Sequence, residues 1–455
     1  MQIENEEVLS KDGLSEEDLS LRKRMRGYYY SSTKSSGLVL KGLRDDGITE
    51  VEVPYGVTEI DNNAFAQRKY VESVVLPETV TNVNFHAFKN CSSLQRIELN
   101  EGLREIPFGC FEGCSGLKEI VLPEGITEIA PYAFSNCYNL SVLSLPESLV
   151  KIGNRAFNGC KNLKEVRIPS LNAWLSIDFM SADSNPMHCG GATLTVDGVP
   201  LTELTVPEGI TEIKANAFTG CACIEKITLP EGLTKLGGSA FSRCDSLCSV
   251  NLPGSLKTIP DYCFFGCKRL TSVTLPEGVK VIKANAFRFS GLCEISLPES
   301  LSVVEFGAFS YCTGLKSIHI KSLARFCDYG GSVNYATPEY RIFIDGVPVT
   351  ELVIPEGVET INTGAFQNCR YITSITIPEG VEKIKSEAFK GCANLEEITI
   401  PVSLNSISDS AFAGCVSLKR VNYRGTKKQW KLISVNNDNK ENKPLLKAKI
   451  GFAKG

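Results

Sequence analysis

The chain has 455 residues, with 48 basic and 52 acidic side chains and a formal net charge of −4. Hydrophobic residues make up 43% and charged residues 22%, which is typical of a folded protein and excludes wholesale disorder. The slightly acidic balance lacks the basic field that a nucleic-acid backbone requires, and no apolar run reaches the ~18 residues of a membrane span.

Residues 1–36 are predicted to form a helix and an N-terminal cap. Ser15 suits the N-cap of a helix between Leu14 and Gly27, because acidic side chains follow it and basic side chains gather near the other end. The first residues are acidic and contain no apolar segment, so we expect no signal peptide.

A repeat dominates the rest of the chain. Phenylalanine, usually preceded by Ala, recurs every 23 residues from Phe65 to Phe157 and again from Phe218 to Phe287, and there are thirteen copies in all. Each copy usually has Cys three residues after the Phe and Leu six residues after it, then an aliphatic pair, Pro, and often Glu-Gly. Internal repeats of this length indicate a stacked array.

The spacing predicts the local structure of one copy. In LKEIVLPEGITEIAPYAF (117–134), alternating apolar residues predict a strand, Pro-Glu-Gly a turn, and ITEI a second short strand. The Ala, Phe, Cys and Leu positions fit one face of a short helical turn. Because one copy cannot bury its apolar face alone, the copies are expected to stack into a solenoid. Its structural residues include Phe88, Cys91, Phe111, Cys114, Phe134 and Cys137.

The pattern LxxIxLPEGVTEIxxxAFxGCxxL resembles the BspA-type, or Treponema-type, leucine-rich repeat over residues 48–423. The resemblance implies an α/β repeat solenoid, right-handed and curved, with ~23-residue repeats, short strands and short helical turns. It also implies binding without catalysis, since family members are mostly bacterial surface or secreted proteins and some adhere to host matrix or other cells.

Two longer intervals between the phenylalanines divide the array. We expect repeat blocks at 37–169, 201–320 and 349–423, separated by inserts at 170–200 and 321–348 and followed by a C-terminal cap and tail at 424–455. Asp197-Gly198 and Asp345-Gly346 predict a tight hairpin turn in each insert. Aromatic residues near the start of the inserts and the tail are interpreted as core plugs: Trp174, Phe326 and Trp430.

Eighteen cysteines are present, and eleven of them occupy the position three residues after the Phe. One Cys per repeat in one column indicates small buried side chains, so we expect a ladder of free thiols rather than a disulfide framework. The spacing gives no clear second pair for zinc, so neither a metal nor a cofactor is expected. The Glu that often follows Pro is interpreted as a solvated turn residue rather than a calcium ligand.

Two surfaces are candidates for binding. On the strand face, outward positions carry Arg96, Glu98, Glu119, Glu165, Arg167, Lys226 and His319. The inserts, whose central sequences differ from each other, offer Asp178, Asp183, His188, Asp328, Tyr329 and Tyr335. The three His residues are far apart in sequence and no phosphate-binding motif is present, so no enzyme is predicted. A pocket of converging polar groups near His188 and Cys189 would change that expectation.

The leading hypothesis is a non-enzymatic binding protein that acts in protein–protein contact or adhesion through its strand face and inserts. The alternative is an intracellular scaffold or structural array. The expected partner is a protein or a glycan, with neither nucleic-acid binding nor membrane insertion, and the oligomeric state is left open. The location is secreted or cell-surface by family resemblance, or cytoplasmic because no signal peptide is expected.

Overall fold

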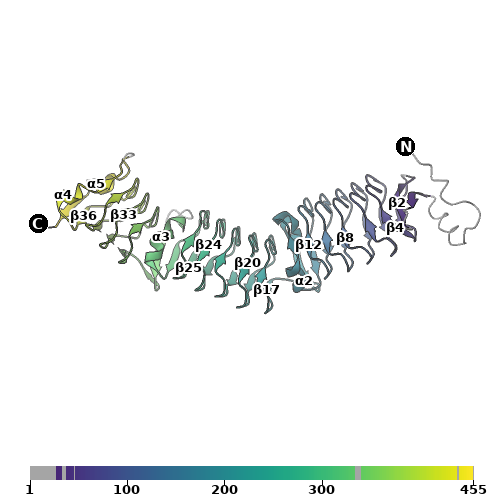
Figure 1. The fold of residues 1–455 in the computed structure, drawn as a ribbon, viewed down its shortest axis with the longest axis horizontal. Helices are drawn as coiled ribbons and strands as arrows, with labels where there is room; N and C mark the ends of the chain where they lie inside the picture. The colour runs from purple at the N-terminus through teal and green to yellow at the C-terminus, as the bar shows by residue number, and fades with distance from the viewer. Residues whose placement is uncertain (1–26, 33–36, 46, 334–339, 438–439, 454–455) are drawn as a thin grey trace, which may run out of the picture. The chain divides into compact units, whose positions relative to one another are not determined.

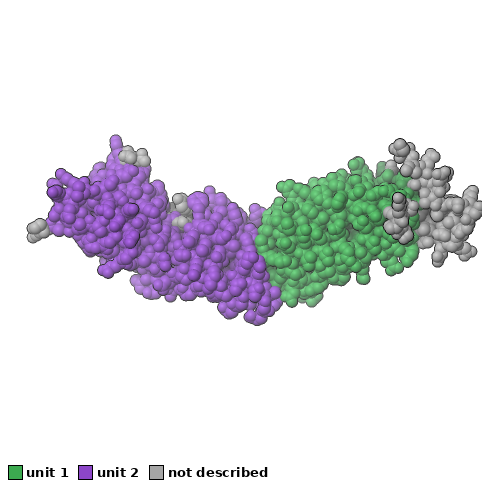
Figure 2. Space-filling model, viewed as in Figure 1, with its two compact units in different colours: residues 1–202, 214–224 green, residues 203–213, 225–455 purple. Residues whose placement is uncertain are grey.

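The computed structural model describes residues 27–32, 37–45, 47–333, 340–437 and 440–453. The chain forms two compact units: unit 1 contains residues 1–202 and 214–224, and unit 2 contains 203–213 and 225–455 (Figure 2). Each unit is a β-solenoid of stacked coils of about 23 residues with little helix (Figure 1). The helix predicted to begin at Leu14 lies outside the described residues.

Each coil contains two short strands and a run of turns. In a representative coil, strand β9 (Glu119–Val121) buries Ile120 and exposes the residues on either side of it. The chain then turns at Gly125, whose φ of 100° favours glycine, and enters β10 (Glu128–Ile129). The predicted order of strand, turn and second strand is therefore confirmed.

Equivalent strands of neighbouring coils pair in parallel within short sheets of two to five strands. In each unit these short sheets follow one another in two rows, which we call the first sheet and the second sheet. We call the outward surface of the first sheet the strand face. The first-sheet strands of unit 1 are β3 (Glu50–Glu52), β5 (Ser73–Val75), β7 (Arg96–Glu98), β9, β11 (Val142–Ser144), β13 (Glu165–Ile168), β15 (Thr193–Val196) and β16 (Val199–Pro200). The second-sheet strands are β1 (Tyr28–Ser32), β2 (Leu38–Leu43), β4 (Val57–Ile60), β6 (Asn82–Val83), β8 (Glu105–Ile106), β10, β12 (Lys151–Ile152) and β14 (Asp178–Phe179).

Unit 2 repeats this arrangement. Its first-sheet strands are β17 (Glu203–Thr205), β19 (Lys226–Thr228), β21 (Ser249–Asn251), β23 (Ser272–Thr274), β25 (Glu294–Leu297), β27 (Ser317–Ile320), β28 (Arg341–Ile344), β29 (Val347–Pro348), β30 (Glu351–Val353), β32 (Ser374–Thr376), β34 (Glu397–Ile400), β36 (Arg420–Tyr423) and β38 (Lys449–Phe452). Its second-sheet strands are β18 (Glu212–Ile213), β20 (Lys235–Leu236), β22 (Thr258–Ile259), β24 (Val281–Ile282), β26 (Val303–Val304), β31 (Thr360–Ile361), β33 (Lys383–Ile384), β35 (Ser406–Ile407) and β37 (Ser434–Val435).

The third side of each coil, which we call the turn face, differs from the expected short helical turn. In every coil the residues two before and two after the repeat Phe have positive φ, such as Asn63 at 59° and Gln67 at 63°. The N–H groups of Asn63, Phe65 and Gln67 donate to carbonyl oxygens of the next coil at 2.7–3.1 Å, and those in between bond three residues back. In a helix, all of these N–H groups would point along the helix axis to carbonyl groups of the same segment. The alternating pattern seen here therefore identifies a series of consecutive turns and not a helical turn.

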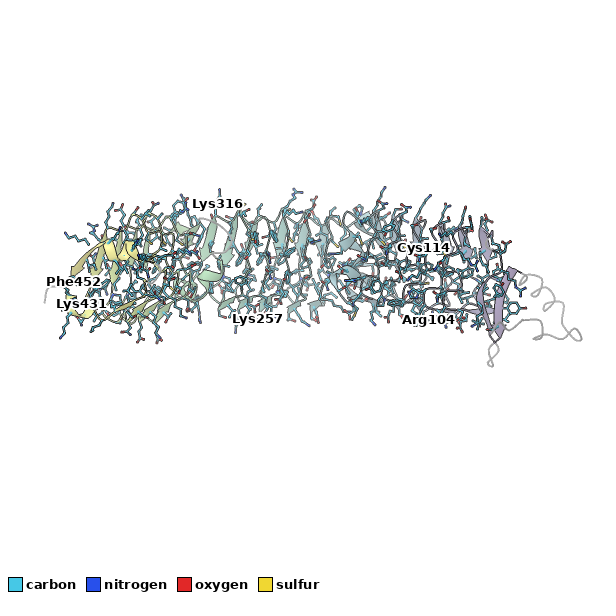
Figure 3. All side chains as sticks on the ribbon, turned by 90° about the horizontal axis from the view of Figure 1, so that it is seen from above. Arg104, Cys114, Lys257, Lys316, Lys431 and Phe452 are labelled. Atoms are coloured by element: carbon cyan, nitrogen blue, oxygen red, sulfur yellow. The ribbon has the colours of Figure 1, made fainter. Side chains whose placement is uncertain are left out.

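The core consists of columns that run from coil to coil. The repeat Phe rings are fully buried and nearly parallel, with centroids 4.9–5.4 Å apart from Phe65 to Phe157. The Cys91 thiol donates to the Phe65 carbonyl oxygen at 2.9 Å, and later coils repeat this contact. Desolvation raises the pKa of Cys137 to about 12. The eleven cysteines of the repeat column are all buried, as the sequence predicted for this position. Cys114, which is labelled in Figure 3, is fully buried.

The inserts are extra coils with a modified turn side, and not loops outside the array. In insert one, β15 extends the first sheet beside β13, and β14 extends the second sheet beside β12. In insert two, β28 extends the first sheet beside β27. The predicted hairpin turns are present, with φ of 49° at Asp197 and 76° at Gly198, and each leads to a short antiparallel strand that ends the sheet.

Three short helices carry the aromatic plugs: α2 (Leu171–Ser176), α3 (Leu323–Val333) and α4 (Lys427–Trp430). The other short helices of the described chain are η2 (Ala182–Ser184), η3 (Pro186–Cys189) and α5 (Lys443–Lys447). Trp174 is fully buried and its Nε1 donates to the Ala217 carbonyl oxygen at 2.9 Å. Phe326 is also fully buried, whereas Trp430 is half-buried with its ring centroid 5.2 Å from that of Tyr423.

Two side chains bond to the backbone at the ends of coils. Glu124 is exposed, as the sequence predicted, and it also accepts hydrogen bonds from the N–H groups of Glu147 and Ser148 in the next coil, at 3.0 and 3.3 Å. At the C-terminal end, Asn442 is fully buried and its Oδ1 accepts from the Phe412 N–H at 2.9 Å. That oxygen takes the place of the carbonyl group that a further coil would provide.

Candidate functional site

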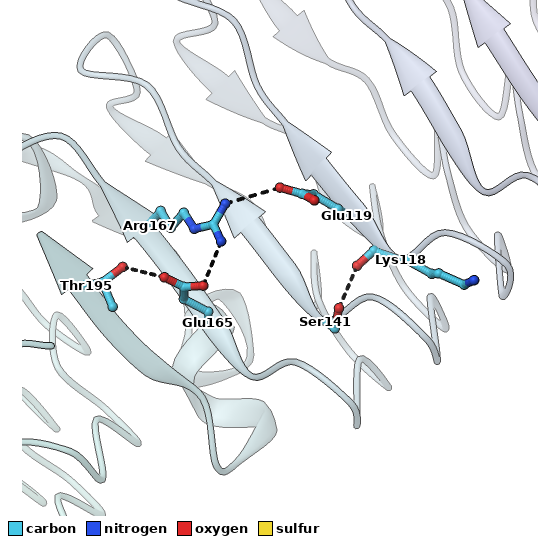
Figure 4. Close-up of polar contacts among 6 residues, drawn as sticks. All are labelled: Lys118, Glu119, Ser141, Glu165, Arg167 and Thr195. Atoms are coloured by element: carbon cyan, nitrogen blue, oxygen red, sulfur yellow. Dashed lines mark hydrogen bonds and ion pairs between the residues drawn. The ribbon is translucent and has the colours of Figure 1, made fainter. Parts of the chain in front are cut away.

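The strand face of unit 1 carries five of the sequence-predicted residues: Arg96 and Glu98 on β7, Glu119 on β9, and Glu165 and Arg167 on β13. Arg167 lies between two carboxylates (Figure 4). Its Nη1 is 3.2 Å from Glu119 Oε1 and its Nη2 is 2.9 Å from Glu165 Oε2. The Thr195 hydroxyl donates to the other oxygen of Glu165 at 3.1 Å.

These charges are balanced within the face. The hydrogen bond from Arg167 lowers the pKa of Glu165, and the same contact raises the pKa of the guanidinium. Arg96 and Glu98 form a second pair at 2.5 Å. Exposed pairs of this kind are screened by salt. The face therefore offers a partner paired charges of both signs.

On the strand face of unit 2, outward side chains between β19 and β27 are mostly neutral, with Glu294 on β25 as an exception. Lys226 is exposed on β19, and the strands that follow place Ser249 and Ser272 in the same outward column. Further along, His319 on β27 stacks on Phe343 of β28, with ring centroids 4.7 Å apart and planes 16° apart. Of the predicted strand-face residues, His319 is the one that lies in an aromatic group.

Basic side chains complete this group. The guanidinium carbon of Arg341 is 3.9 Å from the ring centroid of Tyr371. A shallow cavity of about 240 Å³ is lined by Lys316, Ser317, Tyr340, Arg341, Phe343 and Tyr371. Figure 3 places Lys316 at the edge of unit 2 opposite Lys257. We call Lys316, His319, Arg341, Phe343 and Tyr371 the end group. Within the described part of the chain, neither Lys316 nor Arg341 forms an ion pair.

Sequence reasoning found only His319 of the end group. Phe343 and Arg341 belong to insert two, which was interpreted as interrupting the array. Strand β28 instead pairs with β27 in register, so that Phe343 lies beside His319 and Arg341 beside Ser317. The signal was the alternation in RIFI (341–344), which continues the outward columns of the sheet. The corresponding strand of insert one places Thr195 beside Arg167.

Insert one brings together only some of its predicted residues. His188 Nε2 is 3.3 Å from Asp183 Oδ1, and both lie beside Cys189 at a shallow cavity of about 220 Å³. The Cys189 thiol donates to the Phe157 carbonyl oxygen at 2.9 Å, and burial raises its pKa to about 11. This thiol stays protonated and bonds to the main chain, which is opposite to what a nucleophile requires. Asp178 is exposed on β14.

Insert two departs from expectation. Asp328 is exposed on α3 and lines a shallow cavity with Arg325 and Glu359. Tyr329 is only 5% exposed and packs edge-on against Phe326, so burial raises its pKa. It is a core residue, because α3 turns that side towards the solenoid. Tyr335 lies outside the described residues.

Among the residues that the structure describes, no group of three or more His, Cys, Asp or Glu side chains is arranged to hold a metal ion. In the same described ranges, no helix combines the length and the apolar character needed to cross a membrane.

Comparison with known proteins adds to this geometry. The model of the BspA-type leucine-rich repeat region matches residues 45–179, 197–323 and 339–438. A leucine-rich repeat protein from Bacteroides ovatus has a similar structure, with a TM-score of 0.55 and 24% identity over 94% of this chain and 98% of that one. A leucine-rich cell surface protein from Faecalibacterium prausnitzii gives a TM-score of 0.40 and 25% identity over 90% and 96%. No curated protein matches the sequence significantly.

Proposed function

The chain belongs to the BspA-type leucine-rich repeat family, and on that premise we propose that it is a non-catalytic binding protein with its main site at the end group of unit 2. The partner is a protein segment that carries carboxylates beside apolar side chains. We propose adhesion to a cell surface or host matrix as the setting. Because β28 is part of insert two, this site joins the strand face to an insert, the two surfaces expected from sequence.

One observation carries the proposal: Lys316 and Arg341, which have no acidic partner among the described residues, line one shallow cavity together with the rings of Phe343 and Tyr371. An Arg already stacked on a ring presents its donors in a fixed orientation, which suits the two oxygens of a carboxylate. Aromatic and Arg side chains contribute most to protein–protein binding energy. In unit 1, by contrast, Arg167 already holds two carboxylates.

Binding of labelled poly-L-glutamate, measured by fluorescence anisotropy, tests this site. We expect the native protein to bind it and to bind less tightly as salt increases, because charge attraction steers the complex. Changing Lys316→Gln and Arg341→Gln together should weaken binding at least about tenfold, or about 1.4 kcal/mol. The matched control changes Arg96→Gln and Lys226→Gln, which removes two cations from other strands, and should stay within about twofold. Failure of the native protein to bind, or equal weakening in the control, would contradict the proposal.

The alternative setting, an intracellular scaffold, is favoured by one observation, the ladder of buried free thiols. Reduced cysteines are usual in reducing compartments. Antibody labelling of intact producing cells separates the two settings, because only a surface protein is labelled before the cells are opened. Labelling that requires cell lysis would favour the scaffold and contradict adhesion.

A further inference from the structure

The turn face of unit 2 carries a row of aromatic side chains that the core and the end group do not use. Tyr262, Phe265, Phe289 and Tyr311 follow one another with ring centroids 5.7, 5.7 and 4.6 Å apart. Tyr262 is 41% exposed, Phe289 44% and Tyr311 56%. We call these four residues the aromatic row. Exposed apolar side chains that lie next to one another commonly mark a binding surface.

The backbone under the row is unfavourable for such residues. Phe289 and Tyr311 stand two residues after the repeat Phe, with φ of 58° and 62°. Nine of the other eleven coils have Asn or Gly at this position, and these residues tolerate positive φ. Bulky rings held in this conformation and exposed to solvent are costly for the fold, which points to selection for binding.

Arg288 gives the row a positive charge. Its guanidinium carbon is 5.1 Å from both the Phe289 and the Tyr311 ring centroids. Nη1 donates to Asn285 Oδ1 at 3.2 Å, and Nε is buried without a hydrogen-bond partner in the part of the chain described. Phe289 and Tyr311 stack on each other, so one face of each ring is covered by the other ring and the second face is left. The row therefore attracts a ligand that combines carboxylates with apolar surface.

An extended peptide fits this surface poorly. The Phe289 N–H already donates to the Ser310 carbonyl oxygen at 3.0 Å, and other turn-face N–H groups are used in the same way. A peptide laid along the row would find few main-chain partners there, unlike one added to an open sheet edge. Sugar hydroxyls can remain in water while one apolar side of the ring is covered.

A globular protein also fits poorly, because the row is narrow. The row consists of four adjoining rings, of which Tyr262, Phe289 and Tyr311 are about half exposed. A stable protein interface covers about 800 Å² on each partner, which is more than these partly exposed rings supply. A linear ligand about one ring wide matches the row better.

We propose that the aromatic row binds a linear acidic polysaccharide. A uronate carboxylate accepts hydrogen bonds from Arg288, and the apolar C–H surfaces of neighbouring sugars lie on Phe289 and Tyr311. This site is separate from the proposed protein site, since it lies on the turn face and uses none of the end group. The ligands expected to bind are linear polysaccharides that contain uronate residues.

Isothermal titration calorimetry with polygalacturonate, alginate and hyaluronan tests the proposal, with neutral dextran as the comparison at equal sugar concentration. We expect at least one acidic polymer to bind the native protein and dextran to bind at least tenfold more weakly. Tyr311→Asn and Phe289→Asn should each weaken binding about tenfold, and Arg288→Gln should remove the preference for acidic polymers.

The Asn variants also separate binding from folding. Other coils carry Asn at this position, so the unfolding temperature of both variants should equal or exceed that of the native protein. Their binding of the polysaccharide should nevertheless be weaker. Tyr138→Asn removes an isolated exposed tyrosine of unit 1 and should leave binding unchanged. The Lys316→Gln and Arg341→Gln variant should also keep the polysaccharide, so failure of one site is distinguishable from failure of the other.

Three results would overturn the proposal: no acidic polymer binds the native protein, dextran binds equally well, or Tyr311→Asn binds like the native chain. A fourth would reassign the row to a protein partner, namely loss of poly-L-glutamate binding in Tyr311→Asn with polysaccharide binding retained.

Discussion

The strand faces of units 1 and 2 are built on the same coil and differ in how their charges are used. In unit 1, Arg167 holds Glu119 and Glu165, so its charge is satisfied inside the face. In unit 2, Lys316 and Arg341 have no acidic partner among the described residues. The buried columns are alike in both, so the difference arises at outward positions alone. The repeat thus lets recognition residues vary without altering the core.

The largest expected effect tests the part that the two units share. Phe134→Ala in unit 1 and Phe287→Ala in unit 2 each remove a fully buried ring from a stacked column. Each should lower the free energy of unfolding by about 3–5 kcal/mol in urea denaturation. Val121→Ala, at a 58% exposed position, serves as the control and should stay within about 0.5 kcal/mol. A clear inequality between the two Phe variants would show that the columns are not equivalent.

The next effect distinguishes the inserts. A Cβ at Gly331 on α3 would lie 1.8 Å from the Thr363 carbonyl oxygen, so Gly331→Ala should cost about 1–3 kcal/mol. At Gly191 in insert one the space is open and only the φ of 88° opposes a side chain, so Gly191→Ala should cost about 1 kcal/mol. Thermal unfolding of both variants measures the difference. If the two variants lose the same stability, close packing of α3 against the Thr363 backbone does not stabilise insert two.

Alkaline pH should weaken both units through the thiol ladder. Desolvation raises the pKa of Cys137 in unit 1 and Cys415 in unit 2 from 9.0 to about 12. A raised folded-state pKa gives stability that is complete below pH 9 and is lost as pH rises towards 12, because the unfolded chain releases its protons first. The loss is about 1.4 kcal/mol per pH unit for each such thiol. Urea denaturation between pH 8 and pH 10.5 checks it, and Cys137→Ala should show a shallower slope.

The smallest expected effect concerns the paired charges of unit 1. Arg167→Gln removes an exposed cation whose pairs are screened by salt, so it should lower stability by less than a quarter of the Phe134→Ala loss. The difference from the native protein should shrink further in 1 M NaCl, where the screening length is about 3 Å. Poly-L-glutamate binding should stay within about twofold. A larger loss of binding would place the protein site on unit 1.

Much of the fold could be predicted because its signals are local and recur. Each of these signals lies within a few adjacent residues: the Phe and Cys columns, the strand–Pro–turn order and the Asp-Gly hairpins. Because the same signal recurs in many copies, the prediction does not depend on any single copy. The turn face was mistaken for a helix because spacings of three residues fit consecutive turns equally well. The positive φ at residues such as Asn63 and Gln67 decides between the two. The frequent Asn and Gly residues at these positions were the sequence signal for positive φ.

The candidate site was harder to predict because it depends on register. His319 and Phe343 are far apart in sequence and come together only when β28 pairs with β27. The aromatic row was not predicted for another reason. The predicted binding residues lie on the strand face and the inserts, whereas Phe289 and Tyr311 belong to the turn face. Tyr329 was expected at the surface because an insert suggests exposure, yet α3 folds it into the core.

Asn442 caps one backbone position at the coil of the last repeat Phe. In a stack of identical coils, the last one leaves the N–H of its repeat Phe without a carbonyl group from a following coil, and a second molecule could supply one. Because the Asn442 side chain already occupies the Phe412 N–H and also donates to the Ser408 carbonyl oxygen at 2.9 Å, that position is not available for end-to-end addition. The buried Asn442 amide thus replaces, within the same chain, the hydrogen bond that a following coil supplies to the repeat Phe elsewhere in the array.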